Sequence, residues 1–101
     1  MSKRHPSIEP VHPGEVLRED AFPALGVTKP VLADALGVSR QSLHDIMTLK
    51  RSVTPDMAVR LEAVIGSTAE TWLALQAAHD LWKARKGVSV KGLKKLTAVA
   101  T

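Results

Sequence analysis

The chain has 101 residues, which suffices for one compact domain but is too short for an enzyme with a deep interdomain cleft. Hydrophobic residues make up 45% of it, which excludes global disorder, and the absence of cysteine excludes disulfides and cysteine-based zinc sites. No stretch approaches the ~20 apolar residues of a membrane span, and the polar N-terminus does not resemble a signal peptide. We therefore expect a cytoplasmic protein.

The net charge of +4 is unevenly distributed along the chain. Residues 83–101 hold six of the 14 basic residues and no acidic one, so residues 1–82 carry a net charge of −2. Bulk charge therefore does not argue for a nucleic-acid partner, and the positions of individual cations must decide. We divide the chain into an N-terminal arm (1–12), a helical domain (13–86) and a basic tail (87–101).

Apolar residues recur with helical spacing through the whole helical domain, and strand signals are confined to a short alternating stretch at 87–91. Proline, glycine and hydroxyl residues mark the helix ends. The predicted helices run from Pro13 to a stop at Pro23–Gly26, from Thr28 to Gly37, from Ser39 through Met47, from Thr54 to Gly66, and from a capping box at Ser67–Glu70 to about Lys86. Val31, Leu32, Ala35 and Leu36 form the predicted apolar stripe of the second helix.

The second and third predicted helices are joined by only Gly37, Val38 and Ser39. A short turn with glycine makes two helices cross steeply, as in a helix-turn-helix unit. Ala33 is small where the helices would touch, and Leu43 and Ile46 are apolar where the unit must pack inward. The polar N-terminal side of the third helix is then free to enter a DNA major groove. An ordinary helical hairpin with a solvated face is the alternative.

The polar side of the third helix carries side chains suited to reading bases. Arg40 fits the O6 and N7 atoms of guanine, and Gln41 fits the N6 and N7 atoms of adenine. His44 is a further donor, whereas Asp45 either accepts from a cytosine amine or repels phosphate. Polar residues at helix ends and loops are the candidates for phosphate contacts: Lys29, Ser39, Lys50 and Arg51. We expect the cations of the basic tail to add non-specific affinity for DNA.

The fifth predicted helix has more apolar surface than one side needs for its own core. Trp72 and Trp82 are ten residues apart, close to three helical turns, so both fall near one face. This pattern predicts a symmetric homodimer, with core packing as the alternative or additional role of the same side chains. The predicted interface comprises Trp72, Leu75, Leu81 and Trp82.

Neither a metal site nor a catalytic site is indicated. The four histidines are scattered, and a capping or hydrogen-bonding role suits them better than metal ligation. Ser39, Ser42 and His44 lie close in sequence, but no strained nucleophile turn or oxyanion site accompanies them. We therefore predict no enzyme activity, no cofactor and no metal.

Several separated segments resemble the HigA antitoxin family, which belongs to the Xre/Cro class of repressors and is also called virulence-associated protein I. They are HPGEVL (12–17), LGVT (25–28), LADALGVSR (32–40), TPDMAVRL (54–61) and TWLALQ (71–76). The resemblance covers about residues 12–82, and the segments occur in the family's order. The basic stretch from Lys83 to Lys95 lies outside these matched segments, so the resemblance assigns it no role.

The resemblance implies an all-α, five-helix fold like that of lambda repressor, a homodimer, and a partner toxin. That toxin, HigB, is a ribosome-associated mRNA-cleaving ribonuclease, which such antitoxins neutralise while repressing their own operon. A dimer also predicts a near-palindromic operator in double-stranded DNA. Two alternatives stay open: a stand-alone repressor without a toxin, and a protein-interaction module on this fold without DNA binding, which the acidic balance of residues 1–82 mildly favours.

Overall fold

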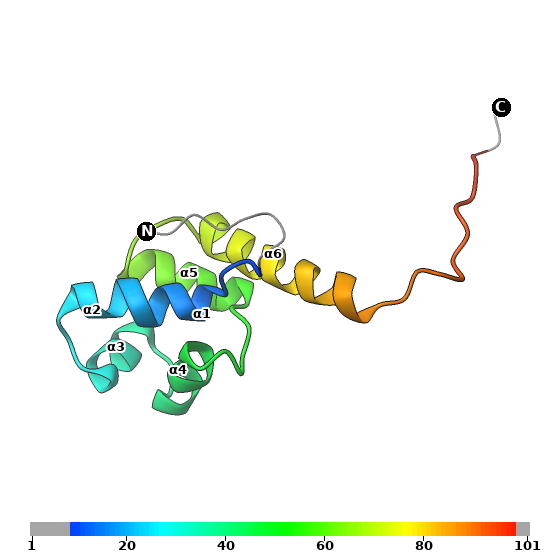
Figure 1. Ribbon diagram of the computed structural model, residues 1–101. Helices are drawn as coiled ribbons and strands as arrows, with labels where there is room; N and C mark the ends of the chain where they lie inside the picture. Colours follow the sequence, from blue (N-terminus) through cyan, green and yellow to red (C-terminus); the bar gives the residue numbers. More distant parts are fainter. Residues whose placement is uncertain (1–8, 99–101) are drawn as a thin grey trace.

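Residues 9–98, the part of the chain that the computed structural model describes, contain five helices and no strand (Figure 1). The first helix is continuous but contains a π-helical turn, which divides it into α1 (Pro13–Val16), η1 (Leu17–Ala21) and α2 (Phe22–Leu25). The others are α3 (Lys29–Leu36), α4 (Arg40–Met47), α5 (Pro55–Val64) and α6 (Ala69–Gly87). The predicted all-α, five-helix fold is confirmed.

Both ends of the chain differ from the helical body. Residues 1–8 of the predicted N-terminal arm and residues 99–101 of the basic tail lie outside the described residues. From Val88 to Ala98 the tail forms no helix or strand and extends away from the body beyond the end of α6 (Figure 1). The alternating stretch at 87–91 therefore does not form a strand, since no neighbouring strand in residues 9–98 pairs with it.

The helix ends are fixed mostly by the local signals that predicted them. Gly26 and Gly37 end their helices in the left-handed conformation, with φ angles of 66° and 71°. The side chains of Ser39 and Thr54 accept hydrogen bonds from backbone N–H groups in the first turns of α4 and α5.

The predicted position of the cap at the start of α6 is wrong by one residue. The N-cap of α6 is Thr68, whose hydroxyl accepts from the backbone N–H of Thr71, whereas Ser67 precedes it at a φ of 58°. Ser67 and Thr68 both fit the sequence pattern of a cap, and only the second has the extended conformation that a cap needs.

The core lies where the five helices meet and is almost entirely aliphatic. It consists of Leu17, Leu32, Ala33, Leu36, Leu43, Ile46, Met47, Val53, Met57, Ala58, Leu61 and Trp72. Val31 and Ala35, predicted in the apolar stripe of α3, are exposed instead. The short α3 turns only one face inward, and that face carries Leu32, Ala33 and Leu36.

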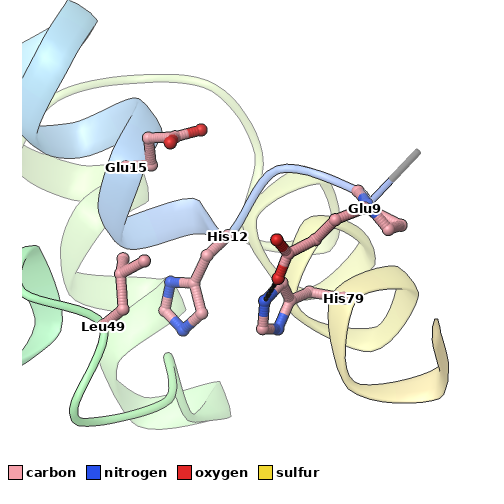
Figure 2. Close-up of a pocket in the computed structure, with 6 residues that line it drawn as sticks. Glu9, His12, Glu15, Leu49 and His79 are labelled. Atoms are coloured by element: carbon pink, nitrogen blue, oxygen red, sulfur yellow. Dashed lines mark hydrogen bonds and ion pairs between the residues drawn. The ribbon is translucent and has the colours of Figure 1, made fainter. Parts of the chain in front are cut away.

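A pair of histidines joins the start of α1 to α6 (Figure 2). His12 is 5% exposed, and its Nδ1 accepts from the backbone N–H of Gly14 at 2.9 Å, which caps α1. The ring of His79 stands edge-on to it at 4.9 Å, and His79 Nε2 lies 3.1 Å from a carboxylate oxygen of Glu9. Burial lowers the pKa of His12, and the neighbouring His79 lowers it further, against the opposing effect of nearby carboxylates.

This environment predicts acid sensitivity of the fold. The folded state lowers the pKa of His12 below its ordinary value of 6.5, so the neutral ring stabilises the fold above that pH and the contribution is lost as the pH falls. His12→Asn keeps an acceptor for the Gly14 N–H but does not titrate. Between about pH 7.5 and about pH 5, we expect the melting temperature to fall less for H12N than for the wild type. An equal fall in both proteins contradicts this role of His12.

Candidate nucleic-acid interface

α3 and α4 form a helix-turn-helix unit joined by the three residues predicted for the turn. α4 turns Leu43, Ile46 and Met47 into the core and lies at the lower edge of the body in Figure 1, far from the basic tail. Its opposite side is exposed and carries Arg40, Gln41 and His44. The expected polar outer face is therefore present on the second helix of the unit, the helix that enters the major groove in such motifs.

The N-terminal end of α4 is held through the turn that precedes it. Arg60 of α5 donates from Nη1 to the carbonyl oxygens of Leu36 and Gly37, at 2.9 Å and 3.3 Å. Its Nε donates to Asp56 at 2.6 Å, which fixes the guanidinium in place. A cation at the last carbonyls of α3 also complements the negative end of that helix dipole. α5 thereby fixes the position of the turn that leads into α4.

The C-terminal end of α4 is held by the first helix. Arg18 of η1 donates from Nη1 to the carbonyl oxygen of Met47 at 2.8 Å. Gly14 of α1 lies so close to α4 that an added Cβ would stand 1.9 Å from the carbonyl oxygen of Ile46. Sequence reasoning assigned no role to Gly14, Arg18 or Arg60; only the glycine in the first turn of a helix was a local signal.

Three of the predicted contact residues interact with one another on this surface. Gln41 Nε2 donates to Asp45 Oδ1 at 2.8 Å, across one helical turn. Arg51 Nη2 lies 3.8 Å from the other carboxylate oxygen of Asp45. The side chain of Asp45 is partly buried, whereas Gln41 and Arg51 are exposed. The carboxylate therefore lies between a predicted base-reading side chain and a predicted phosphate contact.

The predicted phosphate contacts lie at helix ends around α4. Lys29 begins α3, Ser39 caps α4, and Lys50 and Arg51 follow α4; all four are exposed. The backbone N–H groups of Lys50 and Arg51 donate to the carbonyl oxygen of Asp45, at 2.8 Å and 3.1 Å, which fixes the loop after α4. These exposed cations and the capping hydroxyl are free of the core, as the prediction of phosphate contacts requires.

The four predicted dimer residues differ in environment. Trp72 is 3% exposed and lies in the protomer's own core, where its Nε1–H donates to the carbonyl oxygen of Gly66 at 3.2 Å. Leu75 and Trp82 are half-buried, and Leu81 is 51% exposed. The ammonium group of Lys86 stands 4.3 Å above the Trp82 ring. Surface for a partner is thus available at Leu75, Leu81 and Trp82.

Other kinds of site find little support in the part of the chain that the structure describes. No group of three or more histidine or carboxylate side chains there is arranged to hold a metal ion. None of the helices in residues 9–98 is both long enough and apolar enough to cross a membrane.

Comparison with known proteins decides the family. Residues 21–73, which include all of α3, α4 and α5, match the helix-turn-helix family. The chain belongs to this Xre/Cro family. It is 41% identical to virulence-associated protein I of Dichelobacter nodosus over 70% of its length, and spans 66% of that relative. It is 37% identical to antitoxin HigA-1 of Vibrio cholerae, over 75% of this chain and 71% of the relative.

One solved structure resembles this chain over nearly its whole length. Antitoxin GraA, in complex with its operator, is 34% identical, with a TM-score of 0.80 over 95% of this chain and all of the GraA chain. The resemblance to HigA antitoxins read from the sequence is confirmed. The prediction that the chain is not an enzyme agrees with the helix-turn-helix match and with the two antitoxins among these relatives.

Proposed function

We propose that this protein is an antitoxin-type repressor whose helix α4 reads an operator in the DNA major groove. The observation that carries this proposal is the pairing of an exposed Arg40–Gln41 face with a buried inner face on α4. Guanidinium and amide groups at this end of a recognition helix suit guanine and adenine edges. The similar antitoxin GraA is described in complex with its operator.

The contacts divide into two groups under this proposal. Arg40, Gln41 and His44 face base edges, while Lys29, Ser39, Lys50 and Arg51 bind phosphates on either side. Arg18 and Arg60 have a different role in this proposal: Arg18 binds the carbonyl oxygen of Met47 at the end of α4, and Arg60 binds those of Leu36 and Gly37 just before α4. Because both arginines come from outside the helix-turn-helix unit, the orientation of α4 depends on the whole domain.

Binding to DNA upstream of the protein's own gene tests this proposal. Fluorescence anisotropy with that duplex, and with a scrambled duplex of equal length and composition, measures specificity at one fixed salt concentration. We expect the upstream duplex to bind about a thousandfold tighter. Equal affinity for the two duplexes contradicts an operator-binding role and favours a protein-interaction module.

We also infer that the repressor is a homodimer that uses α6. The support is helix α6, on which Leu81 is exposed and Leu75 and Trp82 are only half-buried. Sedimentation at micromolar concentration should give a dimer for the wild type and a monomer for Leu81→Glu. Lys83→Glu, a change at an exposed position of the same helix, should leave the dimer intact. A wild-type monomer contradicts the inference.

We propose that the partner is a HigB-like ribonuclease toxin. The support is the likeness to antitoxin HigA-1 and to virulence-associated protein I. Co-expression with the product of the adjacent gene tests it: the pair should co-purify, and growth arrest caused by that product should be relieved. An adjacent gene product that neither binds nor arrests growth favours a stand-alone repressor.

A further inference from the structure

The carboxylate of Asp45 fixes the orientation of the Gln41 side-chain amide. Gln41 Nε2 and Asp45 Oδ1 are 2.8 Å apart. An ionised carboxylate only accepts hydrogen bonds, so the Gln41 atom that faces it must be the amide nitrogen. One N–H of Gln41 is therefore directed at Asp45, which leaves Oε1 as an acceptor and the second N–H as a donor.

We propose that Asp45 is a positioning residue that makes Gln41 select adenine, and is not itself a base reader; this rests on the proposed function, with α4 in the major groove. Adenine presents a donor at N6 and an acceptor at N7, which match the acceptor and the remaining donor of the held amide. Guanine presents acceptors at both O6 and N7. Pairing with both would need two free donors, and Asp45 already engages one of them.

The position of Asp45 agrees with this indirect role. Its side chain is 20% exposed, whereas Gln41, one turn nearer the start of α4, is exposed. The N-terminal residues of a recognition helix lie nearest the base edges, so Gln41 would lie closer to a base than Asp45 does. The negative charge of Asp45 also disfavours the acceptor atoms of guanine at the same base edge.

Arg51 is the second partner of this carboxylate. Its Nη2 lies 3.8 Å from Asp45 Oδ2, so the ion pair uses the oxygen that Gln41 does not. The side chain of Arg51 is 55% exposed, and an ion pair so long and so solvated is weak. Arg51 therefore remains available for phosphate while the Gln41–Asp45 hydrogen bond persists.

A base-substitution series with four variants tests the proposal. The position read by Gln41 is the one at which Gln41→Ala loses discrimination among the four base pairs. There, the wild type should prefer adenine over guanine by about tenfold or more. Asp45→Ala should reduce this preference to within about threefold, and Asp45→Asn, which keeps an acceptor oxygen, should retain most of it. In the Gln41→Ala background, Asp45→Ala should change nothing further at this position.

The results that contradict the proposal differ from those that contradict the proposed function. If D45A keeps the adenine preference and instead loses a cytosine preference at another position, Asp45 reads a base directly and the proposal is wrong. A D45A effect that persists undiminished in the Q41A background assigns Asp45 to general folding of α4, which also overturns the proposal. Wild-type protein that binds operator and scrambled duplexes alike overturns the proposed function itself, before Asp45 is considered.

Discussion

Replacing Gly14 with alanine should destabilise the protein more than a methyl group added at any of its other glycines. The new Cβ would stand 1.9 Å from the carbonyl oxygen of Ile46 and 2.9 Å from its carbonyl carbon. Both are backbone atoms inside α4, so relief requires α1 and α4 to move apart. Overpacking of a well-packed core costs about 1–3 kcal/mol or more, and the backbone position of this clash places G14A at the upper end.

The measurement is the free energy of unfolding from urea denaturation, with the melting temperature as a second readout. A loss of about 3 kcal/mol corresponds to a fall of roughly 12–24 °C in melting temperature for a domain of this size. Gly92→Ala in the tail is the matched control, because a Cβ there meets nothing within 4 Å. If G14A is as stable as G92A, the close approach of α1 to α4 is not a structural requirement.

The second large effect concerns reading of the operator by α4. Arg40→Ala and Gln41→Ala should each weaken binding to the operator by about 1–3 kcal/mol. On a scrambled duplex the loss should be small, because phosphate contacts dominate there. Lys50→Ala is the control of opposite type: it should weaken binding to both duplexes alike. Circular dichroism checks that each variant is folded.

Two results contradict this assignment in different ways. Equal losses on operator and scrambled duplexes would show that Arg40 and Gln41 bind phosphates and carry no sequence information. No loss on either duplex would show that α4 is not the reading helix. Because a dimer presents two copies of α4, the protected DNA should also be a near-palindrome, with half-sites about one helical turn or a multiple apart.

Much of the fold was predictable from the sequence because the residues that begin and end its helices act locally. Gly26 and Gly37 occupy left-handed positions that other residues avoid, and Ser39 and Thr54 satisfy N–H groups three residues away. The outer face of α4 follows from the same logic. Once Leu43 and Ile46 turn inward, helical periodicity leaves Arg40, Gln41 and His44 outside.

The parts that sequence reasoning missed depend on contacts between distant segments. Arg18 and Arg60 bond to carbonyl oxygens 29 and 24 residues away, and nothing beside either arginine indicates its partner. Gln41 and Asp45 are four residues apart, a spacing that permits contact on a helix but does not say which partner a side chain chooses. Trp72 was open to core or interface roles until the packing of α6 against α5 placed it in the core.

The π-helical turn determines how the first helix responds to a change in its length. The N–H of Phe22 bonds to the carbonyl oxygen of Leu17, five residues earlier, so this turn contains one residue more than a regular turn. Deleting one residue between 17 and 21 would return this turn to regular α-helical geometry, and the flanking segments α1 and α2 would keep nearly the same faces toward the core. Gly14 would then keep its place against α4. Among relatives of this chain, a one-residue gap in this segment is therefore compatible with the same packing of the first helix.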